Sequence, residues 1–157
     1  MMINNRVLIF ILLAALVLSC SRNSSSLKDG YYTAQAAEFD EYGWKEDVTI
    51  CVSAEKIILI EYNAFNISGF LKSWDMQNMR NMSAAKGIYP NAYTRSYAAM
   101  ALSRQGTEGI DSISGATVSH RKFIALTDAA IKNARRGNTE TELVHFTKNL
   151  NPEILVN

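Results

Sequence analysis

Alternating apolar and polar positions in the first half of the chain predict β-strands. Residues 31–39 are rich in aromatic and small side chains, and Val48, Ile50 and Val52 alternate with their neighbours at the period of a half-buried strand. Four consecutive apolar residues at 57–60 suit a further strand that is covered on both faces. Because the last two strands are separated by a short connection at 53–55, we expect them to form a hairpin.

The second half of the chain changes to helical spacing in three segments. Candidate end signals delimit them, with Ser73 or Asp75 and Gly87 around the first, Pro90 and Gly106 around the second, and Gly137 after the third. The third segment has the clearest apolar stripe, made of Phe123, Leu126, Ala130, Ile131 and Ala134. Strands followed by helices predict an α+β domain, in which a small antiparallel sheet from the N-terminal half carries about three helices.

The N-terminus has the pattern of a secretory signal. Arg6 precedes an unbroken apolar run at 7–18, which is 12 residues long. A helix that spans a bilayer needs roughly 20 residues, so residues 1–19 are predicted to be a signal peptide. The sequence VLSC at 17–20 resembles the lipobox of bacterial lipoproteins. That resemblance implies that Cys20 receives a diacylglyceryl group, and the alternative is a plain signal peptide with a chance cysteine.

The sequence after the signal indicates a tether, one domain and a tail. Residues 20–28 are rich in serine and are predicted to be a flexible link from the lipid to the domain. The domain is expected over 29–137, and the tail at 138–157 has no clear pattern. A chain that starts at Cys20 has 15 basic and 15 acidic residues, so no basic surplus exists to hold nucleic acid. We expect the domain on the periplasmic or cell-surface side of a membrane.

The segment DSISGAT at 111–117 stands directly before the strongest helix. Gly115 and Ala116 remove side-chain bulk, so another molecule could approach the backbone. Thr117 lies at the start of the helix, where free amides and the dipole favour an anion such as a phosphate. From spacing alone, the simpler interpretation is that Ser114, Thr117 or Ser119 merely caps the helix.

A family resemblance favours a phosphate site over a simple helix cap. The sequence DSISGATVS at 111–119 is similar to the motif of the FMN-binding domain family, in which a separate flavin transferase joins FMN through its phosphate to the last hydroxyl residue. The resemblance implies attachment at Thr117, within a motif formed by Asp111, Ser114, Gly115 and Ala116. The sequence DGYYT at 29–33 resembles the family's opening strand. A narrower resemblance, through FDEYGWKE at 39–46 and the lipobox, is to the "major membrane immunogen" lipoproteins of spirochaetes.

The remaining chemistry points to a cofactor that a partner installs. A threonine hydroxyl is a poor nucleophile without a base or a metal, and no cluster of residues at metal-ligand spacing is present in the sequence. His120 is expected to face solvent, whereas Trp44, Trp74, Tyr89 and Tyr93 either stack on a flavin ring or, more simply, pack in the core or at its rim.

The resemblance therefore implies an FMN-carrying electron carrier with an unknown redox partner, without catalytic residues of its own. Two alternatives stay open. One is a lipid-anchored binding or structural protein, similar to the immunogen lipoproteins, that keeps the fold without flavin. The other is a reductase that binds FMN loosely.

Overall fold

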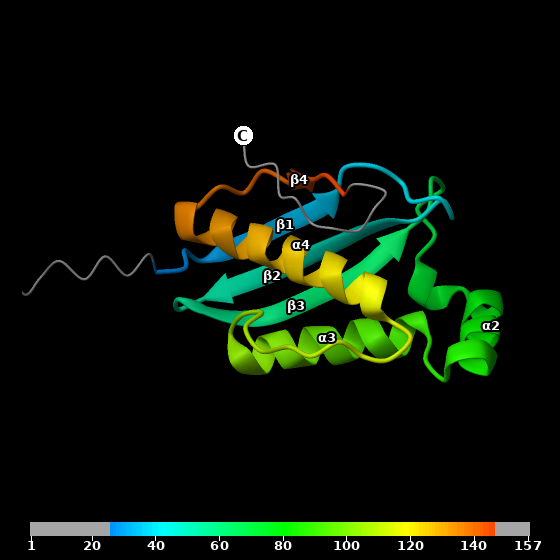
Figure 1. Cartoon of the computed structure of the whole chain (residues 1–157). Helices are drawn as coiled ribbons and strands as arrows, with labels where there is room; N and C mark the ends of the chain where they lie inside the picture. Colours follow the sequence, from blue (N-terminus) through cyan, green and yellow to red (C-terminus); the bar gives the residue numbers. More distant parts are fainter. Residues whose placement is uncertain (1–25, 147–157) are drawn as a thin grey trace, which may run out of the picture.

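The alternating side chains of three consecutive strands build an antiparallel sheet. In the computed structural model, which describes residues 26–146, β1 (Gly30–Ala36), β2 (Lys45–Ser53) and β3 (Lys56–Phe65) pair as antiparallel neighbours (Figure 1). A short β4 (Glu142–Val144) pairs in parallel with the other side of β1, which gives the order β3-β2-β1-β4. The predicted α+β class is confirmed. The signal peptide, Cys20 and most of the predicted tether lie outside the described residues.

Three helices follow the antiparallel strands. They are α2 (Met76–Lys86), α3 (Pro90–Arg104) and α4 (Thr117–Arg136), and a 3-10 turn, η1 (Lys72–Trp74), precedes them. Helix α3 packs along β3 and α4 packs across β1 and β2, so both cover the same face of the sheet (Figure 1). Helix α2 lies beyond the end of the sheet and has no buried residue.

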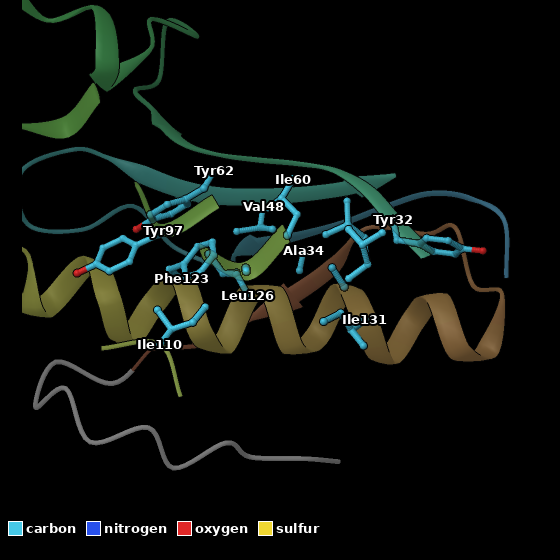
Figure 2. Close-up of a cluster of buried hydrophobic side chains, with 14 of the residues drawn as sticks. Tyr32, Ala34, Val48, Ile60, Tyr62, Tyr97, Ile110, Phe123, Leu126 and Ile131 are labelled. Carbon is cyan, nitrogen blue, oxygen red and sulfur yellow. The ribbon is translucent and has the colours of Figure 1, made fainter. Parts of the chain in front are cut away.

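The core lies between the sheet and the two packed helices. Val48, Ile60 and Leu126 converge there (Figure 2), and each is nearly inaccessible to solvent. Burying each such side chain stabilises the fold by about 1.5–3 kcal/mol, because apolar surface leaves water. The predicted stripe of the third helix is confirmed, since all five of its residues are buried: Phe123, Leu126, Ala130, Ile131 and Ala134.

The hairpin between β2 and β3 closes as predicted, but β3 is not covered on both faces. Ala54 and Glu55 both have a positive φ, which is the conformation of a two-residue hairpin turn. The register shifts at the start of β3, where Val52 pairs with Ile57 and Cys51 with Leu59. Because of this bulge Ile57 and Ile60 are both buried, whereas Ile58 is 56% and Leu59 45% exposed. The apolar run at 57–60 therefore marks a bulged edge strand.

Two of the three predicted helix C-termini are confirmed, as is one of the two predicted N-caps for the first helix. Asp75 caps α2 by accepting hydrogen bonds from the amides of Gln77 and Asn78, and Gly87 ends this helix with a left-handed backbone. Gly137 ends α4 in the same way. The end of α3 was predicted at Gly106, but the left-handed residue is Gln105, with φ 57°.

Gln105 is held in this conformation by a contact far away in the sequence. Its side-chain amide donates to the carbonyl of Ile57 at 2.9 Å and its Oε1 accepts from the Ile57 amide at 2.8 Å. These two bonds satisfy backbone groups of Ile57, beside the bulge. A glutamine therefore occupies a left-handed position that usually favours glycine.

The fourth strand comes from the segment for which the sequence showed no clear pattern. Residues 142–144 pair with 34–36 of β1, so the sheet extends beyond the predicted end of the domain at Gly137. The Ala37 amide donates to the Val144 carbonyl at 2.8 Å and continues this pairing. The sheet therefore has one parallel pair in addition to the predicted antiparallel ones.

Candidate functional site

The motif loop, defined as residues 110–117, connects α3 to α4 and is held from below by two aromatic side chains. The Tyr97 hydroxyl accepts from the Ile113 amide at 2.9 Å and donates to the Ala116 carbonyl at 3.2 Å. The His120 ring places Nε2 2.9 Å from the Ile110 carbonyl and packs against the ring of Tyr97, with centroids 5.5 Å apart. These contacts fix the backbone of the loop against the middle of α3 and the first turn of α4.

The small residues of the motif make room for the protein's own chain. Gly115 has φ +81°, and a Cβ there would lie 2.9 Å from Ile88 Cγ2 and 3.1 Å from Lys86 Cβ. Ala116 is 4% exposed and belongs to the core. The expectation that both residues leave space for another molecule is therefore corrected. Gly115 lets the loop pack against the connection between α2 and α3, and Ala116 fills the core beneath it.

The other three predicted residues, Asp111, Ser114 and Thr117, are exposed on the loop. The Ser112 hydroxyl donates to Thr117 Oγ1 at 3.3 Å, so the threonine proton stays available to an outside acceptor. Thr117 is the first residue of α4, and Ala116 occupies the N-cap without a side-chain hydrogen bond to the helix. The capping hypothesis for Ser114, Thr117 and Ser119 is therefore wrong.

An uncapped helix start has a chemical consequence. The first amides of an α-helix have no partner inside the helix, and in α4 no described side chain caps them. These amides and the dipole favour an anion beside Thr117, by about 0.3–1 kcal/mol at an exposed site. The motif loop thus presents a hydroxyl group next to a position that suits a phosphate.

His120 differs from the sequence prediction. It is half-buried instead of facing solvent, because its ring lies between the Ile110 carbonyl and Tyr97. Its role in the structure is to tie the first turn of α4 to the start of the motif loop.

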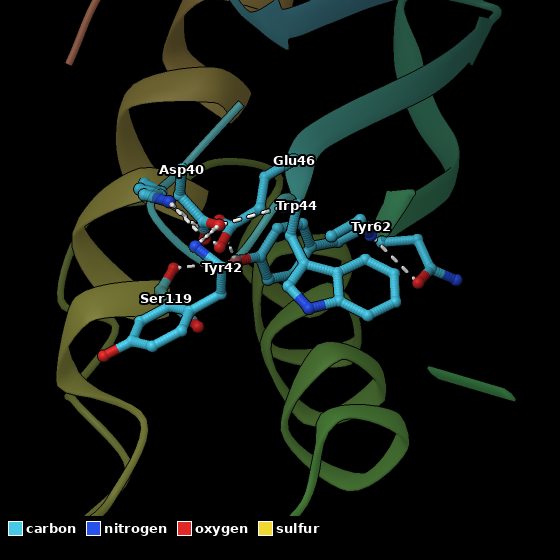
Figure 3. A network of polar contacts seen from close by, with 9 residues as sticks. Asp40, Tyr42, Trp44, Glu46, Tyr62 and Ser119 are labelled. Carbon is cyan, nitrogen blue, oxygen red and sulfur yellow. Dashed lines mark hydrogen bonds and ion pairs between the residues drawn. The ribbon is translucent and has the colours of Figure 1, made fainter. Parts of the chain in front are cut away.

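A buried polar network lies beneath the same turn of α4 (Figure 3). The Tyr62 hydroxyl is 2.7 Å from Glu46 Oε2 and 2.9 Å from the Ser119 carbonyl. Lys122 Nζ reaches Glu46 at 3.4 Å and Asp40 at 3.7 Å. Glu46 is 3% and Lys122 8% exposed, so both charged side chains are largely withdrawn from water. The network joins β2, β3 and the loop at 40–43 to the helix that follows the motif.

Burial is the main cause of the pKa shifts in this region. It raises the pKa of Glu46, and the nearby Lys122 ammonium and the Tyr62 hydroxyl oppose that rise. Burial also raises the pKa of Tyr62 well above its usual range and that of Tyr93 to about 12. Burial lowers the pKa of Lys72, whose ammonium lies 5.6 Å from the centre of the Trp44 ring.

This network was not predicted from the sequence, although a signal for it exists there. Glu46 is two residues before Val48, so it has the inward-facing parity of β2. Lys122 is four residues before Leu126, so it lies on the apolar stripe of α4. Charged residues at inward-facing positions of two elements suggest a buried pair, but the sequence does not reveal that the two elements meet.

A groove lies between α2 and Tyr89, the residue that precedes α3. It has a volume of about 390 Å³ and is lined by Met79, Arg80, Ser83, Ala84 and Tyr89. Of the aromatic residues considered for flavin stacking, Tyr93 is a core residue and Trp74 is 63% exposed. Trp44 is half-buried beneath Lys72, and only Tyr89 of the four lines this groove.

The described residues contain neither a candidate metal centre nor a membrane-spanning helix. Within 26–146, no three His, Cys, Asp or Glu side chains gather as metal ligands. In the same part of the chain, no helix combines the length and the apolar character that crossing a bilayer requires.

Comparisons with known proteins identify two informative relatives. The "15 kDa lipoprotein" of Treponema pallidum (strain Nichols) is 36% identical over 128 residues, which cover 82% of this chain and 89% of that protein. The crystal structure of the CPE2226 protein from Clostridium perfringens is 36% identical and superimposes with a TM-score of 0.74, covering 77% of this chain and 99% of the other. No family model matches the sequence. The resemblance to spirochaete lipoproteins is therefore confirmed, whereas the resemblance to the FMN-binding domain family stays a prediction.

Proposed function

Because the chain belongs to the family of the 15 kDa lipoprotein of Treponema pallidum, we propose that it is a lipoprotein anchored through Cys20 outside the cytoplasm, and that it carries FMN on Thr117 as an electron carrier. The family supports the lipid anchor, for which the sequence VLSC at 17–20 supplies the cysteine. A diacylglyceryl group has two chains, and two chains hold a protein durably on a membrane.

The observation that carries the flavin proposal is the uncapped and exposed start of α4. Thr117 combines an accessible hydroxyl with the free first-turn amides of a 20-residue helix. A phosphate joined to this hydroxyl would lie against those amides, where the helix dipole favours its charge. The residues present therefore fit the phosphate end of FMN. The motif at 111–117 supplies the resemblance that identifies the phosphate as part of a flavin.

The attachment chemistry needs a second protein. The Thr117 oxygen forms a bond to the phosphorus of a flavin donor whose phosphate is activated as an anhydride. The anhydride bond breaks, the displaced phosphate compound takes the bonding electrons, and the threonine proton passes to a base on the transferase. Thr117 has no histidine or carboxylate among its hydrogen-bond partners in the described chain, only Ser112, so the base is assigned to the enzyme.

The domain's own residues would position the flavin. Tyr97 and His120 fix the loop, while the network around Glu46 fixes the helix turn that follows. When bound, the flavin supplies the redox chemistry, and the protein determines its location and surroundings. The function that follows is electron transfer at the membrane surface to a redox partner.

A second candidate function is a lipid-anchored binding or structural protein without flavin. It is favoured by the name of the Treponema relative, which states a lipoprotein and no cofactor, and by the lack of a matching family model. Both candidates share the anchor at Cys20 and differ only at Thr117.

The intact mass of the protein purified from its own cells separates the two candidates. The proposal predicts a chain that begins at Cys20 and carries the masses of both the lipid and one FMN, retained after denaturation. A mass that includes the lipid but no flavin supports the second candidate and contradicts the first. Flavin that is lost on denaturation would instead indicate the loosely bound FMN of a reductase.

A further inference from the structure

We propose that the groove on α2 is the seat of the isoalloxazine ring of the flavin attached to Thr117. This inference rests on the proposed function and adds to it the surface against which the ring packs. The lining residues are Met79, Arg80, Ser83, Ala84 and Tyr89, and the volume of about 390 Å³ lies within the range of small-molecule sites, roughly 300–1,000 Å³.

The groove is next to the attachment point because Gly115 connects them. Gly115 packs against Lys86 and Ile88, and Tyr89 is the next residue along the chain. Thr117 is two residues beyond Gly115, so their Cα atoms are at most about 7 Å apart. The ribityl chain of FMN joins phosphate to ring, and it would bridge from the start of α4 over this contact into the groove. Figure 1 shows the start of α4 at the same end of the sheet as α2.

The lining residues match the apolar dimethylbenzene end and the polar pyrimidine end of an isoalloxazine ring. Tyr89 offers an aromatic face for stacking, and Met79 and Ala84 offer apolar or polarizable contact to the dimethylbenzene part. Arg80 brings a guanidinium whose Nη2 has a neutral partner, Gln77 Oε1, at 3.4 Å. A cation stabilises the pyrimidine part of the ring, which becomes anionic on reduction.

The packing of α2 gives an independent reason to expect an occupant. The helix has 11 residues, none of them buried, and isolated helices of this length are marginal in water. Met79 and Ala84 gain cover when a planar ring lies on them. We therefore expect α2 to be more stable in the flavin-carrying protein than in the flavin-free one.

Hydrogen exchange of the unmodified and the flavin-carrying protein tests this location directly. The full chain is produced with and without an active flavin transferase, and exchange is followed by mass spectrometry. The proposal predicts that the amides of residues 76–89 exchange several-fold more slowly when flavin is attached. Equal exchange in this segment, in protein shown to be flavinylated, would overturn the groove as the ring site.

Variants identify the residues involved. Tyr89→Leu should raise the native flavin fluorescence per attached flavin several-fold, because an aromatic side chain stacked on the ring quenches its emission. Arg80→Gln should lower the midpoint potential of the flavin, since the cation that favours the reduced anion is lost. Arg95→Gln is the matched control, because Arg95 pairs with Glu61 at 3.5 Å on the side of α3 that faces β3. This control should change neither property.

The outcomes separate this inference from the proposed function. Attached flavin is measured first by in-gel fluorescence after denaturation. A dark wild-type band, with a transferase that labels a known acceptor, contradicts the proposed function and this inference together. A fluorescent wild-type band with identical native emission and potential in Tyr89→Leu, Arg80→Gln and Arg95→Gln contradicts the groove alone.

Discussion

Replacing Lys122 by methionine removes the cation from the buried network beneath the motif loop. Lys122 Nζ lies 3.4 Å from Glu46 and 3.7 Å from Asp40, and the lysine side chain is 9% exposed. Methionine keeps much of the apolar stem and removes the charge. Glu46, which is 3% exposed in the wild type, is then left with the Tyr62 hydroxyl as its side-chain partner in the network.

The expected loss of unfolding free energy is large because a buried carboxylate is left without its counter-ion. Breaking a buried pair from one side costs about 3–5 kcal/mol. Domains of this kind have a free energy of unfolding of about 5–15 kcal/mol, so the change consumes a large fraction of it. Removing both charges in Glu46→Gln combined with Lys122→Met should recover most of the loss, since a neutral amide still bonds Tyr62.

The loss should also depend on pH. Burial raises the pKa of Glu46, and removing Lys122 raises it further. A carboxyl whose pKa is raised by folding contributes stability that is complete below its unfolded pKa and is lost as the pH rises through the folded pKa. The unfolding free energy that Lys122→Met loses relative to wild type should therefore be greatest at about pH 8 and shrink towards about pH 5.

Urea denaturation followed by tryptophan fluorescence measures these differences. The single variant should unfold at a lower urea concentration than wild type, with an unchanged slope, and the double variant should lie between them and lack the additional pH dependence of the single variant. The reasoning is refuted if Lys122→Met equals wild type at about pH 8, or if the double variant is as unstable as the single one.

Asp47, Gly115 and Cys20 each offer a test by a single substitution. Burial, together with the nearby Glu61 and Glu46, raises the pKa of Asp47 from 3.8 to about 6. The wild type should therefore lose stability as the pH rises through about 6. In urea titrations at neutral pH, Asp47→Asn should gain at most about 3 kcal/mol of unfolding free energy. Gly115→Ala should cost about 1–2 kcal/mol for the left-handed backbone, plus the overlap with Ile88, and a thermal midpoint equal to that of Ser114→Ala would contradict this. Cys20→Ser should abolish incorporation of labelled fatty acid, and labelling at the wild-type level would exclude the lipobox.

Local signals explain why much of the fold was predictable. The alternation through Val48 and Ile50, the cap at Asp75 and the glycine at 137 each act within a few residues of the chain. The stripe of α4 has the period of a helix and continues for almost its whole length. Features that depend on neighbouring residues alone therefore appear in the sequence.

The features that were missed depend on contacts between distant segments. Gln105 ends α3 because its side chain bonds Ile57, 48 residues away. Glu46 and Lys122 are 76 residues apart and meet only once α4 lies on the sheet. The three residues of β4 are too few for a pattern, and their pairing depends on the open edge of β1.

The motif loop has one feature that the sequence predicted and one that it did not. Its position before α4 and the place of Thr117 at the start of that helix were expected from the sequence. The reason for Gly115 was not, because the close neighbour is the segment at 86–88 and not a second molecule. The smallness of a residue does not reveal from the sequence which group approaches it.

Flavin attachment at Thr117 is the central claim, and in-gel fluorescence under denaturing conditions tests it most directly. Wild type, Thr117→Ser and Thr117→Ala are each co-expressed with a flavin transferase whose activity is verified on a known acceptor. No side chain of residues 26–146 caps α4, so Thr117→Ala should fold with a helical circular dichroism spectrum like that of wild type. The account predicts fluorescent bands for wild type and Thr117→Ser and a dark band for Thr117→Ala. A fluorescent Thr117→Ala band, or a dark wild-type band, would contradict it.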